Sequence, residues 1–468
     1  METPNKEPST NRHVLYIIMG GSGSGKTTLL QHVVYENKIC KAAKKYSTRP
    51  TRPNIISNGI TIQDDTNHLE LEDIEKKCDV LYERNGNKYG ASSSEIIEEL
   101  NRDNYIIVIS DIRSIKYLKK KVEESGHFVK VIYILSKMDS YDEFSKTCET
   151  RINSSYMNDE EKSPSKVKEK IVERLEDFSE KLKNVKGFGI SETNQLCQDI
   201  KSYFPDSESN EKRYEKIKFT FKQYVYNIGL FDYVILNTTT LDDLYRQADN
   251  IINFNNNPSN MRVSKHQRIK GPVIFVVCAS PKSGKGTLME NLNIMGANQI
   301  QITPKYSNRN PEPNDKRDGM CAIGKDDFEK LITNEIKNGN FRCWSFHGGT
   351  KYAIKRDDVI SRLNQGIPQI FVSNFQALTK VLEKNGNGNN WRNISSRFVY
   401  IYLHRVRTDA QIKCQVDKSK IKDVKKTHED YIKNISLIDH VLINPDNLTF
   451  SEDLHDQMMS LIELYKMN

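Results

Sequence analysis

Short apolar runs alternate along this chain with stretches whose apolar residues recur at helical spacing. In the first half the runs are 14–19, 105–109, 131–135 and 233–236, and segments such as 94–101 and 166–183 carry the helical pattern. Runs of this length are typical of buried strands, and strand–helix alternation indicates a parallel sheet covered by helices. The pattern therefore predicts an α/β fold.

The second half repeats features of the first in the same order. The run 14–19 leads into GGSGSGKTTLL, and the run 273–279 leads into SPKSGKGTL. KYSTR recurs as KYSNR, NKYGAS as TKYAIK, VISDI as FVSNF and FDYVILN as IDHVLIN. Ordered recurrence of this kind indicates two copies of one domain, each expected to be a P-loop unit with its own parallel sheet.

The spacing of the repeats sets the expected domain boundaries. The offset between matching segments falls from 263 to 207 residues, so the first copy carries about 56 additional residues. We expect a first domain at 11–253 with a polar insertion at about 185–214, whose role the sequence does not define. A polar, Asn-rich linker at 254–270 and a more degenerate second domain at 271–468 follow.

Composition narrows the functional classes. Among the 468 residues, 70 Lys and Arg oppose 62 Asp and Glu, a net charge of +8 that favours phosphate binding without indicating a specific nucleic-acid partner. The longest apolar runs are far shorter than the ~20 residues of a membrane span, so we expect no membrane partner. Eight scattered cysteines without a CxxC pair, and an N-terminus without an apolar core, lead us to expect a reduced, cytoplasmic protein.

The strongest chemical signal is Gly20-x-x-x-x-Gly25-Lys26-Thr27, a full Walker A pattern between a strand and a helix. Its glycines allow backbone N–H groups to surround phosphate oxygens at a helix N-terminus. Lys26 would contact the β- and γ-phosphates, and the Thr27 hydroxyl would ligate Mg²⁺. The pattern predicts an ATP site formed by Gly20, Gly21, Ser22, Gly23, Ser24, Gly25, Lys26, Thr27 and Thr28.

The second copy has a weaker version of this loop. Ala279 replaces the first glycine and Gly286 replaces the hydroxyl residue after the lysine. Two interpretations stay open: a nucleotide site like the GKGT loops of small-nucleotide kinases, or a relic that binds nucleotide poorly or not at all. The candidate ATP-binding residues here are Gly284, Lys285, Gly286 and Thr287.

The ordered motifs resemble guanylate kinase over roughly 11–250 and 270–465. These motifs are the P-loop, the T-R-x-x-R segment, the glycine turn, the Tyr-Gly segment and the late FDYVILN strand. The resemblance implies phosphoryl transfer from ATP, with Mg²⁺, to a nucleoside monophosphate. It also implies that each domain has a P-loop core, a small acceptor-binding region and a lid.

The resemblance assigns roles to individual residues. Arginine forks clamp phosphate in two places and stay charged when partly buried, which suits the acceptor-phosphate positions. Lid arginines would join Lys26 in catalysis by neutralising charge on the transferred group. Asp111 would help to hold Mg²⁺ or the acceptor nucleoside. The implied residues are Arg49, Arg52, Tyr89, Ser92 and Asp111 for the acceptor, Arg151 and Arg174 for the lid, and Arg309 and Tyr352 in the second copy.

Departures from the family pattern put the acceptor in question. Val80 lies where the family has a guanine-reading glutamate, so base choice should relax or change. In the second copy Glu312 replaces the second clamp arginine and Asn374 replaces Asp111. The second domain is therefore expected to be degenerate or regulatory.

Two further functions compete with a nucleoside monophosphate kinase. The segments DDTNHLELEDIEK and VISDIRSIKYL are similar to stretches of ribose bisphosphokinase, whose sugar phosphate acceptor has no base. Alternatively, the chain is a catalytically silent binding module, as guanylate kinase-like domains are in scaffold proteins. The intact loop and clamp of the first copy favour an enzyme.

Overall fold

The computed structural model describes two compact units. One consists of Met1–Thr51, Asp64–Lys137 and Thr220–Asn468, and the other of Arg52–Gln63 and Met138–Phe219. Within the smaller unit, β4 (Ile55–Ser57) pairs with β5 (Ile60–Ile62) in antiparallel fashion. The described residues are 12–21, 23–49, 55–57, 60–62, 66–84, 86–136, 219–260, 269, 271–294, 299–311, 319–336, 341–345, 350–375, 394, 397–407, 412–413, 415–416, 418–445 and 451–466.

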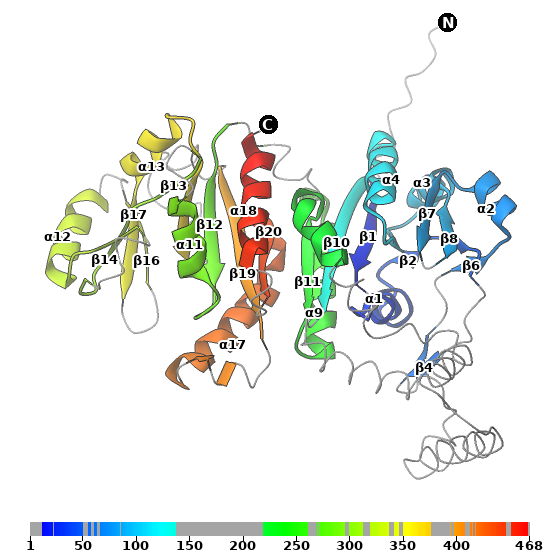
Figure 1. Ribbon diagram of the computed structural model, residues 1–468, viewed down its shortest axis with the longest axis horizontal. Coiled ribbons are helices and arrows are strands. Elements are labelled where there is room, and N and C mark those ends of the chain that lie inside the picture. Colours follow the sequence, from blue (N-terminus) through cyan, green and yellow to red (C-terminus); the bar gives the residue numbers. More distant parts are fainter. Residues whose placement is uncertain are drawn as a thin grey trace, which may run out of the picture. The chain divides into compact units, whose positions relative to one another are not determined.

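A five-stranded parallel sheet forms the centre of the first half (Figure 1). Its central strand is completely buried, as an uninterrupted apolar run predicts. The four apolar runs identified in the sequence all lie in this sheet, so the predicted parallel sheet is confirmed. The strand order is β11 (Tyr233–Asn237), β10 (Phe128–Ser136), β1 (Val14–Gly20), β9 (Tyr105–Val108) and β2 (Lys41–Ala42).

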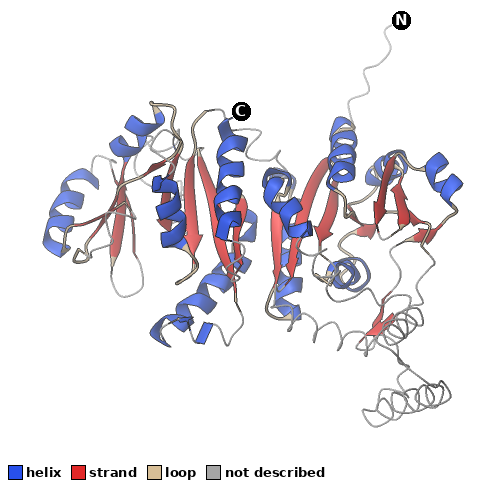
Figure 2. Ribbon diagram, viewed as in Figure 1, coloured by secondary structure: helices blue, strands red, loops and turns tan. Residues whose placement is uncertain are grey.

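Helices alternate with these strands (Figure 2). The expected helix at 94–101 is α3 (Ser93–Leu100). The next helix, α4 (Ile112–Glu124), buries Ile112, Ile115, Leu118 and Val122, whose spacing of three or four residues makes one apolar face. Among the described residues of this half, further helices are α1 (Lys26–Leu30), continued by the π-helical η1 (Gln31–Glu36), α2 (Leu71–Lys77) and α9 (Leu241–Asn256).

Each half also has a smaller mixed sheet, separate from the parallel one. In the first half its order is β6 (Asn67–His68), β3 (Tyr46–Ser47), β8 (Asn87–Ala91) and β7 (Val80–Arg84). In the second half it is β15 (Met320–Ala322), β14 (Lys305–Ser307), β17 (Lys351–Lys355) and β16 (Phe341–Ser345). KYSTR and KYSNR thus contribute equivalent strands.

The second half also has a five-stranded parallel sheet. Its order is β13 (Gln301–Ile302), β18 (Gln369–Ser373), β12 (Ile274–Ala279), β19 (Phe398–Val406) and β20 (His440–Pro445). Read from the opposite edge, this is the strand order of the first half. Its helices are α11 (Lys285–Ile294), α12 (Lys325–Ile336), α13 (Arg356–Leu363), α17 (Lys418–Lys433) and α18 (Ser451–Lys466).

The expected linker begins inside regular structure. Helix α9 extends to Asn256, and the 3₁₀ turn η4 (Pro258–Asn260) follows it. Residues 261–268, the insertion at about 185–214 and the helical pattern at 166–183 lie outside the described residues. No helix in the described part of the chain combines the length and apolarity needed to cross a membrane.

A buried glutamine covers the outer edge of each parallel sheet. Gln247 of α9 accepts a hydrogen bond from Leu236 N at 2.9 Å and donates to Leu236 O at 3.1 Å. Gln457 of α18 makes the same pair with Ile443, at 2.8 Å each. Buried backbone groups without a partner are costly, so these glutamines stabilise strands that are not hydrogen-bonded to another strand on that side.

We predict that Gln247→Leu lowers the urea midpoint of unfolding. The substitution leaves the buried N–H and C=O of Leu236 without partners, at a cost of about 1–3 kcal/mol for each group. Gln365→Leu is the matched control, because Gln365 is exposed. Urea titrations followed by circular dichroism would measure both midpoints, and equal midpoints for the two variants would contradict this role of Gln247.

Candidate functional site

The Walker A segment forms a tight loop at the carboxyl end of β1. A Cβ added at Gly20 would lie 2.7 Å from the carbonyl oxygen of Ile134, so the strand requires glycine there. Gly25 has φ 95° and directly precedes α1. The loop therefore joins the central strand to a helix N-terminus, the geometry in which backbone N–H groups bind anions.

Lys26 folds back over this loop. Its Nζ donates to the carbonyl oxygens of Gly20 at 2.9 Å and Gly21 at 2.5 Å, and lies 3.4 Å from Ser24 Oγ. Thr27 is exposed and Thr28 half-buried at the start of the helix. The lysine ammonium is thus held at the loop by its own main chain.

Asn237, at the end of β11, supports the loop from one side. Its Nδ2 donates to Ser24 O at 2.9 Å. A Cβ added at Gly25 would lie 2.6 Å from that nitrogen, so the close approach requires glycine. Asn237 was not predicted as a site residue, although an asparagine ends both FDYVILN and IDHVLIN.

The loop of the second half has the same supports. Lys285 Nζ donates to Ala279 O at 3.3 Å and Ser280 O at 3.0 Å, and Asn444 Nδ2 donates to Ser283 O at 2.8 Å. Gly284 has φ 100°. Gly286 is half-buried and Thr287 exposed in the first turn of α11.

Two arginines hold this second loop. Arg405 Nη1 donates to Lys282 O at 2.9 Å, and the buried Arg407 donates to Pro281 O at 3.3 Å. Lys282 itself has φ 56°, a left-handed conformation that side-chain-bearing residues rarely adopt. Residues at the end of β19 therefore fix the backbone of this loop.

Asp111 lies beside the phosphate loop of the first half. The backbone N of Ile109 donates to Ile18 O at 3.1 Å, which brings the segment after β9 alongside the end of β1. One Asp111 carboxylate oxygen accepts from Ser114 N at 2.7 Å and caps α4. The observed role of Asp111 is helix capping, and its metal or acceptor role stays a prediction.

Two cations connect the small sheet to this end of β9. The buried Lys45 donates from Nζ to Val108 O at 3.2 Å, and Lys305 repeats the contact with Val372 O at 2.9 Å. Arg84 Nη1 donates to Ser110 Oγ. Lys45, Lys305 and Arg84 were not predicted as site residues. The recurrence of KYS in both halves could have indicated the two lysines.

Arg49 and Tyr89 are brought together by the small sheet. Ser47 of β3 pairs with Tyr89 of β8, and Ser47 Oγ accepts from Arg49 N at 3.0 Å. Arg49 Nη2 donates to Thr66 Oγ1 at 2.8 Å. Tyr89 stacks on Tyr82 with 5.3 Å between ring centroids.

The second half repeats this arrangement with its own residues. Tyr352 pairs with Ser307, and Ser307 Oγ accepts from Arg309 N at 3.4 Å. The Arg309 guanidinium donates to Asn310 O at 3.0 Å. Lys305 Nζ lies 5.3 Å from the centroid of the Tyr352 ring.

Ser92 and Val80 have structural roles, and the acceptor role of Ser92 stays a prediction. Ser92 is buried and caps α3 by accepting from Glu95 N at 3.3 Å, and Val80 is 1% exposed in β7. Next to it, the Asp79 carboxylate accepts from Ser93 N at 2.7 Å and from Tyr117 at 3.1 Å. Burial alone raises the pKa of Asp79, but these hydrogen bonds outweigh it and hold the pKa below its ordinary value.

Several predicted residues cannot be placed at the site. Ser22, Arg52, Arg151 and Arg174 lie outside the described residues, as does Glu312. Within the described ranges, no group of three or more His, Cys, Asp or Glu residues has the arrangement of a metal site.

We predict that Gly25→Ala removes the stabilisation of the protein by Mg·ATP. The substitution places a side chain at φ 95° and against Asn237 Nδ2, and the backbone strain alone costs more than about 1 kcal/mol. Gly126→Ala is the matched control, because Gly126 has φ +92° and no atom within 4 Å of an added Cβ. Thermal unfolding with and without nucleotide would measure the shift, and a Gly25→Ala variant that keeps the parent's shift would contradict the predicted site.

Comparison with known proteins gives a limited result. No protein-family model matches the chain, and no curated protein matches it by sequence. Among solved structures, the guanylate kinase from Anaplasma phagocytophilum is similar to this chain with 16% identity and a TM-score of 0.31. The match covers 43% of this chain and 89% of that one.

Proposed function

We propose that this protein transfers a phosphoryl group from ATP to a nucleoside monophosphate, in a Mg²⁺-dependent, guanylate kinase-like reaction. The first domain (11–253) carries the activity, and the second domain (271–468) is degenerate or regulatory. One observation carries the proposal. Lys45 and Arg84 connect the small sheet to the carboxyl end of the parallel sheet, which is also where the Lys26 loop lies. Donor and acceptor regions thereby share one end of the sheet.

The donor side rests on the loop between β1 and α1. Backbone N–H groups of 20–27 and the Lys26 ammonium would bind the ATP phosphates. Because Asn237 holds the Ser24 carbonyl, the loop is supported before nucleotide arrives. Support of this kind reduces the reorganisation that phosphate binding requires.

The acceptor side rests on Arg49 and Tyr89. Ser47 pairs with Tyr89 and its hydroxyl accepts a hydrogen bond from the Arg49 backbone N, so both residues are attached to the same small sheet. Together they would bind the acceptor phosphate, with Arg52 as the second clamp. Phosphoryl transfer depends mainly on positioning and charge neutralisation, to which Arg151 and Arg174 would contribute.

The proposed Mg²⁺ ligands are Thr27 and Asp111. The exposed Thr27 hydroxyl and the half-buried Asp111 carboxylate are both oxygen ligands, as Mg²⁺ prefers alongside phosphate oxygens and water. When bound, the ion would neutralise charge on the β- and γ-phosphates. The chain's own part is to orient the phosphates through Lys26 and the loop amides.

The second domain keeps the loop shape and loses part of its chemistry. Gly286 supplies no hydroxyl where Thr27 supplies one. The loop backbone at 281–282 accepts hydrogen bonds from Arg405 and Arg407. These differences support a regulatory or supporting role rather than a second equal centre.

One observation favours a second acceptor class, a ribose bisphosphate-like sugar phosphate. Val80 is buried where a base-reading carboxylate is expected, and Asp79 is occupied by Ser93 and Tyr117. A screen with labelled ATP would separate the classes by using GMP, dGMP, AMP, CMP, UMP and ribose bisphosphate as acceptors. Transfer to none of them would favour the silent binding module.

We predict that Lys26→Ala lowers turnover by at least about 100-fold, the usual cost of removing a positioned group that stabilises transition-state charge. Lys285→Ala is the matched control in the equivalent loop and should lower turnover by no more than about threefold. Steady-state rates on the acceptor found in the screen would measure both. Equal losses in the two variants would instead indicate two working centres.

We also predict that Arg49→Ala raises the KM for the acceptor by about tenfold, because a charge-assisted phosphate contact is lost. The KM for ATP should change much less. Initial rates with one substrate varied at a time would give both constants, with Arg309→Ala as the control in the second half. A parallel rise in both constants would rule out an acceptor-specific role for Arg49.

A further inference from the structure

The outermost strands of the two parallel sheets lie against each other. β11 is the edge of the first sheet and β20 is the edge of the second, and the two strands are in contact without forming a continuous sheet. Edge strands carry backbone groups that need partners from outside the sheet. On β11, Leu236 obtains its partner from Gln247 of the same half.

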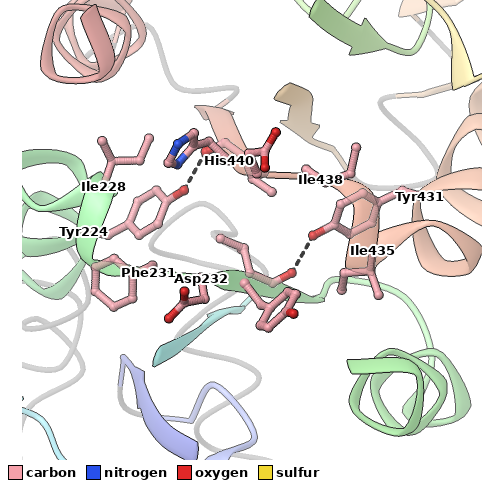
Figure 3. Close-up of a pocket in the computed structure, with 12 residues that line it drawn as sticks. Tyr224, Ile228, Phe231, Asp232, Tyr431, Ile435, Ile438 and His440 are labelled. Carbon is pink, nitrogen blue, oxygen red and sulfur yellow. Dashed lines mark hydrogen bonds between the residues drawn. The ribbon is translucent and has the colours of Figure 1, made fainter. Parts of the chain in front are cut away.

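Val234 lies two residues before Leu236, so its backbone groups point to the same side of β11. Its carbonyl accepts a hydrogen bond from Tyr431, which belongs to the second half, at 2.5 Å. Tyr224 of the first half donates in the same way to Val441 O on β20, at 2.5 Å. Figure 3 shows these two hydrogen bonds side by side. Burial raises the pKa of both tyrosines well above the ordinary value, so both hydroxyls stay protonated donors.

The two contacts are related by one sequence offset. Tyr431 lies 207 residues after Tyr224, and Val441 lies 207 residues after Val234. The small cavity between the halves is lined by six residues of the first half and by the six residues found 207 positions later. The first-half members are Tyr224, Ile228, Phe231, Asp232, Tyr233 and Val234.

The surroundings of the tyrosines follow the same relation. Tyr224 stacks on Tyr133 of β10 at 4.6 Å, and Tyr431 stacks on Tyr402 of β19 at 4.4 Å. Helix α9 packs on the 3₁₀ turn η6 (Ile435–Leu437), and α18 packs on η3 (Ile228–Leu230). The last helix of each half thus packs on the 3₁₀ turn of the other half.

These contacts make an isologous interface, in which the same surface patch is used on both sides. We propose that the two halves form an internal dimer, and that each half completes the exposed sheet edge of the other. The partner that fits the β11 edge is therefore the second half of the same chain.

Polar contacts at the margin make the pairing specific. Arg246 Nη2 lies 2.9 Å from Glu429 Oε2, and Asn250 Nδ2 donates to Ile432 O at 2.9 Å. The first residue of each pair is on α9 and the second on α17. The exposed ion pair contributes little to affinity, but it favours the second half over a like-charged partner.

The internal dimer also supports both phosphate loops. Val234 lies three residues before Asn237, which holds Ser24 O, and Val441 lies three residues before Asn444, which holds Ser283 O. Each loop is therefore supported by a strand whose outer edge is covered by the opposite half. This inference rests on packing alone and does not require phosphoryl transfer.

Hydrogen exchange in the uncut chain, followed by mass spectrometry, tests the proposal. We expect Tyr431→Phe to speed amide exchange in β11 of the first half at least about fivefold, because a buried carbonyl loses its donor. We expect Tyr224→Phe to speed exchange in β20 of the second half to a similar extent. Tyr16→Phe is the control, because Tyr16 is buried in the central strand β1 and should leave exchange in β20 unchanged. Effects confined to the half that carries each substitution would overturn the proposal.

A second measurement does not depend on any buried substitution. A protease site placed at 261–268 in the full chain would allow the linker of the folded protein to be cut. We expect the two fragments to elute together in size-exclusion chromatography at low micromolar concentration. The cut chain carrying Tyr224→Phe and Tyr431→Phe should dissociate at a lower urea concentration than the cut parent. Fragments that separate as soon as the linker is cut would overturn the internal dimer.

Discussion

Several backbone groups at the carboxyl ends of the two parallel sheets, and along their β11 and β20 edges, are buried, and each of them needs a hydrogen-bond partner. Side chains supply many of these partners. Gln247 serves Leu236, Tyr431 serves Val234, Lys45 serves Val108 and Asn237 serves Ser24. These few hydrogen bonds connect the loop after β1, the small sheet and the opposite half to the parallel sheet of the first half.

This constraint explains why cationic side chains gather at one end of the sheet. Carbonyl groups at the carboxyl ends of strands attract positive donors, and Lys26 and Lys45 both donate to such carbonyls. Arg84 reaches the adjacent Ser110. Three cationic side chains, Lys26, Lys45 and Arg84, thus contact groups at this end of the sheet, although the net charge of the chain is only +8.

The two halves use the same scaffold with different chemistry. The supports of the loop are equivalent, since Lys26 matches Lys285 and Asn237 matches Asn444. The differences lie in Gly286 and in the arginines that hold the second loop.

The sequence by itself determined the α/β class, four of the five strands of the first parallel sheet and the position of the glycine-rich loop after β1. Apolar periodicity and glycine spacing are local properties, so they can be read without knowing which strands are neighbours. The acceptor roles of Arg49 and Tyr89, which the family resemblance implies, stay predictions. The capping roles of Asp111 and Ser92 were not predicted. The sequence alone does not show whether a polar residue before a helix binds a ligand or caps the helix. Lys45, Arg84, Asn237 and the tyrosine pair Tyr224 and Tyr431 were decided only by the tertiary structure. Their partners lie from 26 to 217 residues away, and no local pattern states which distant carbonyl or hydroxyl a buried donor will find.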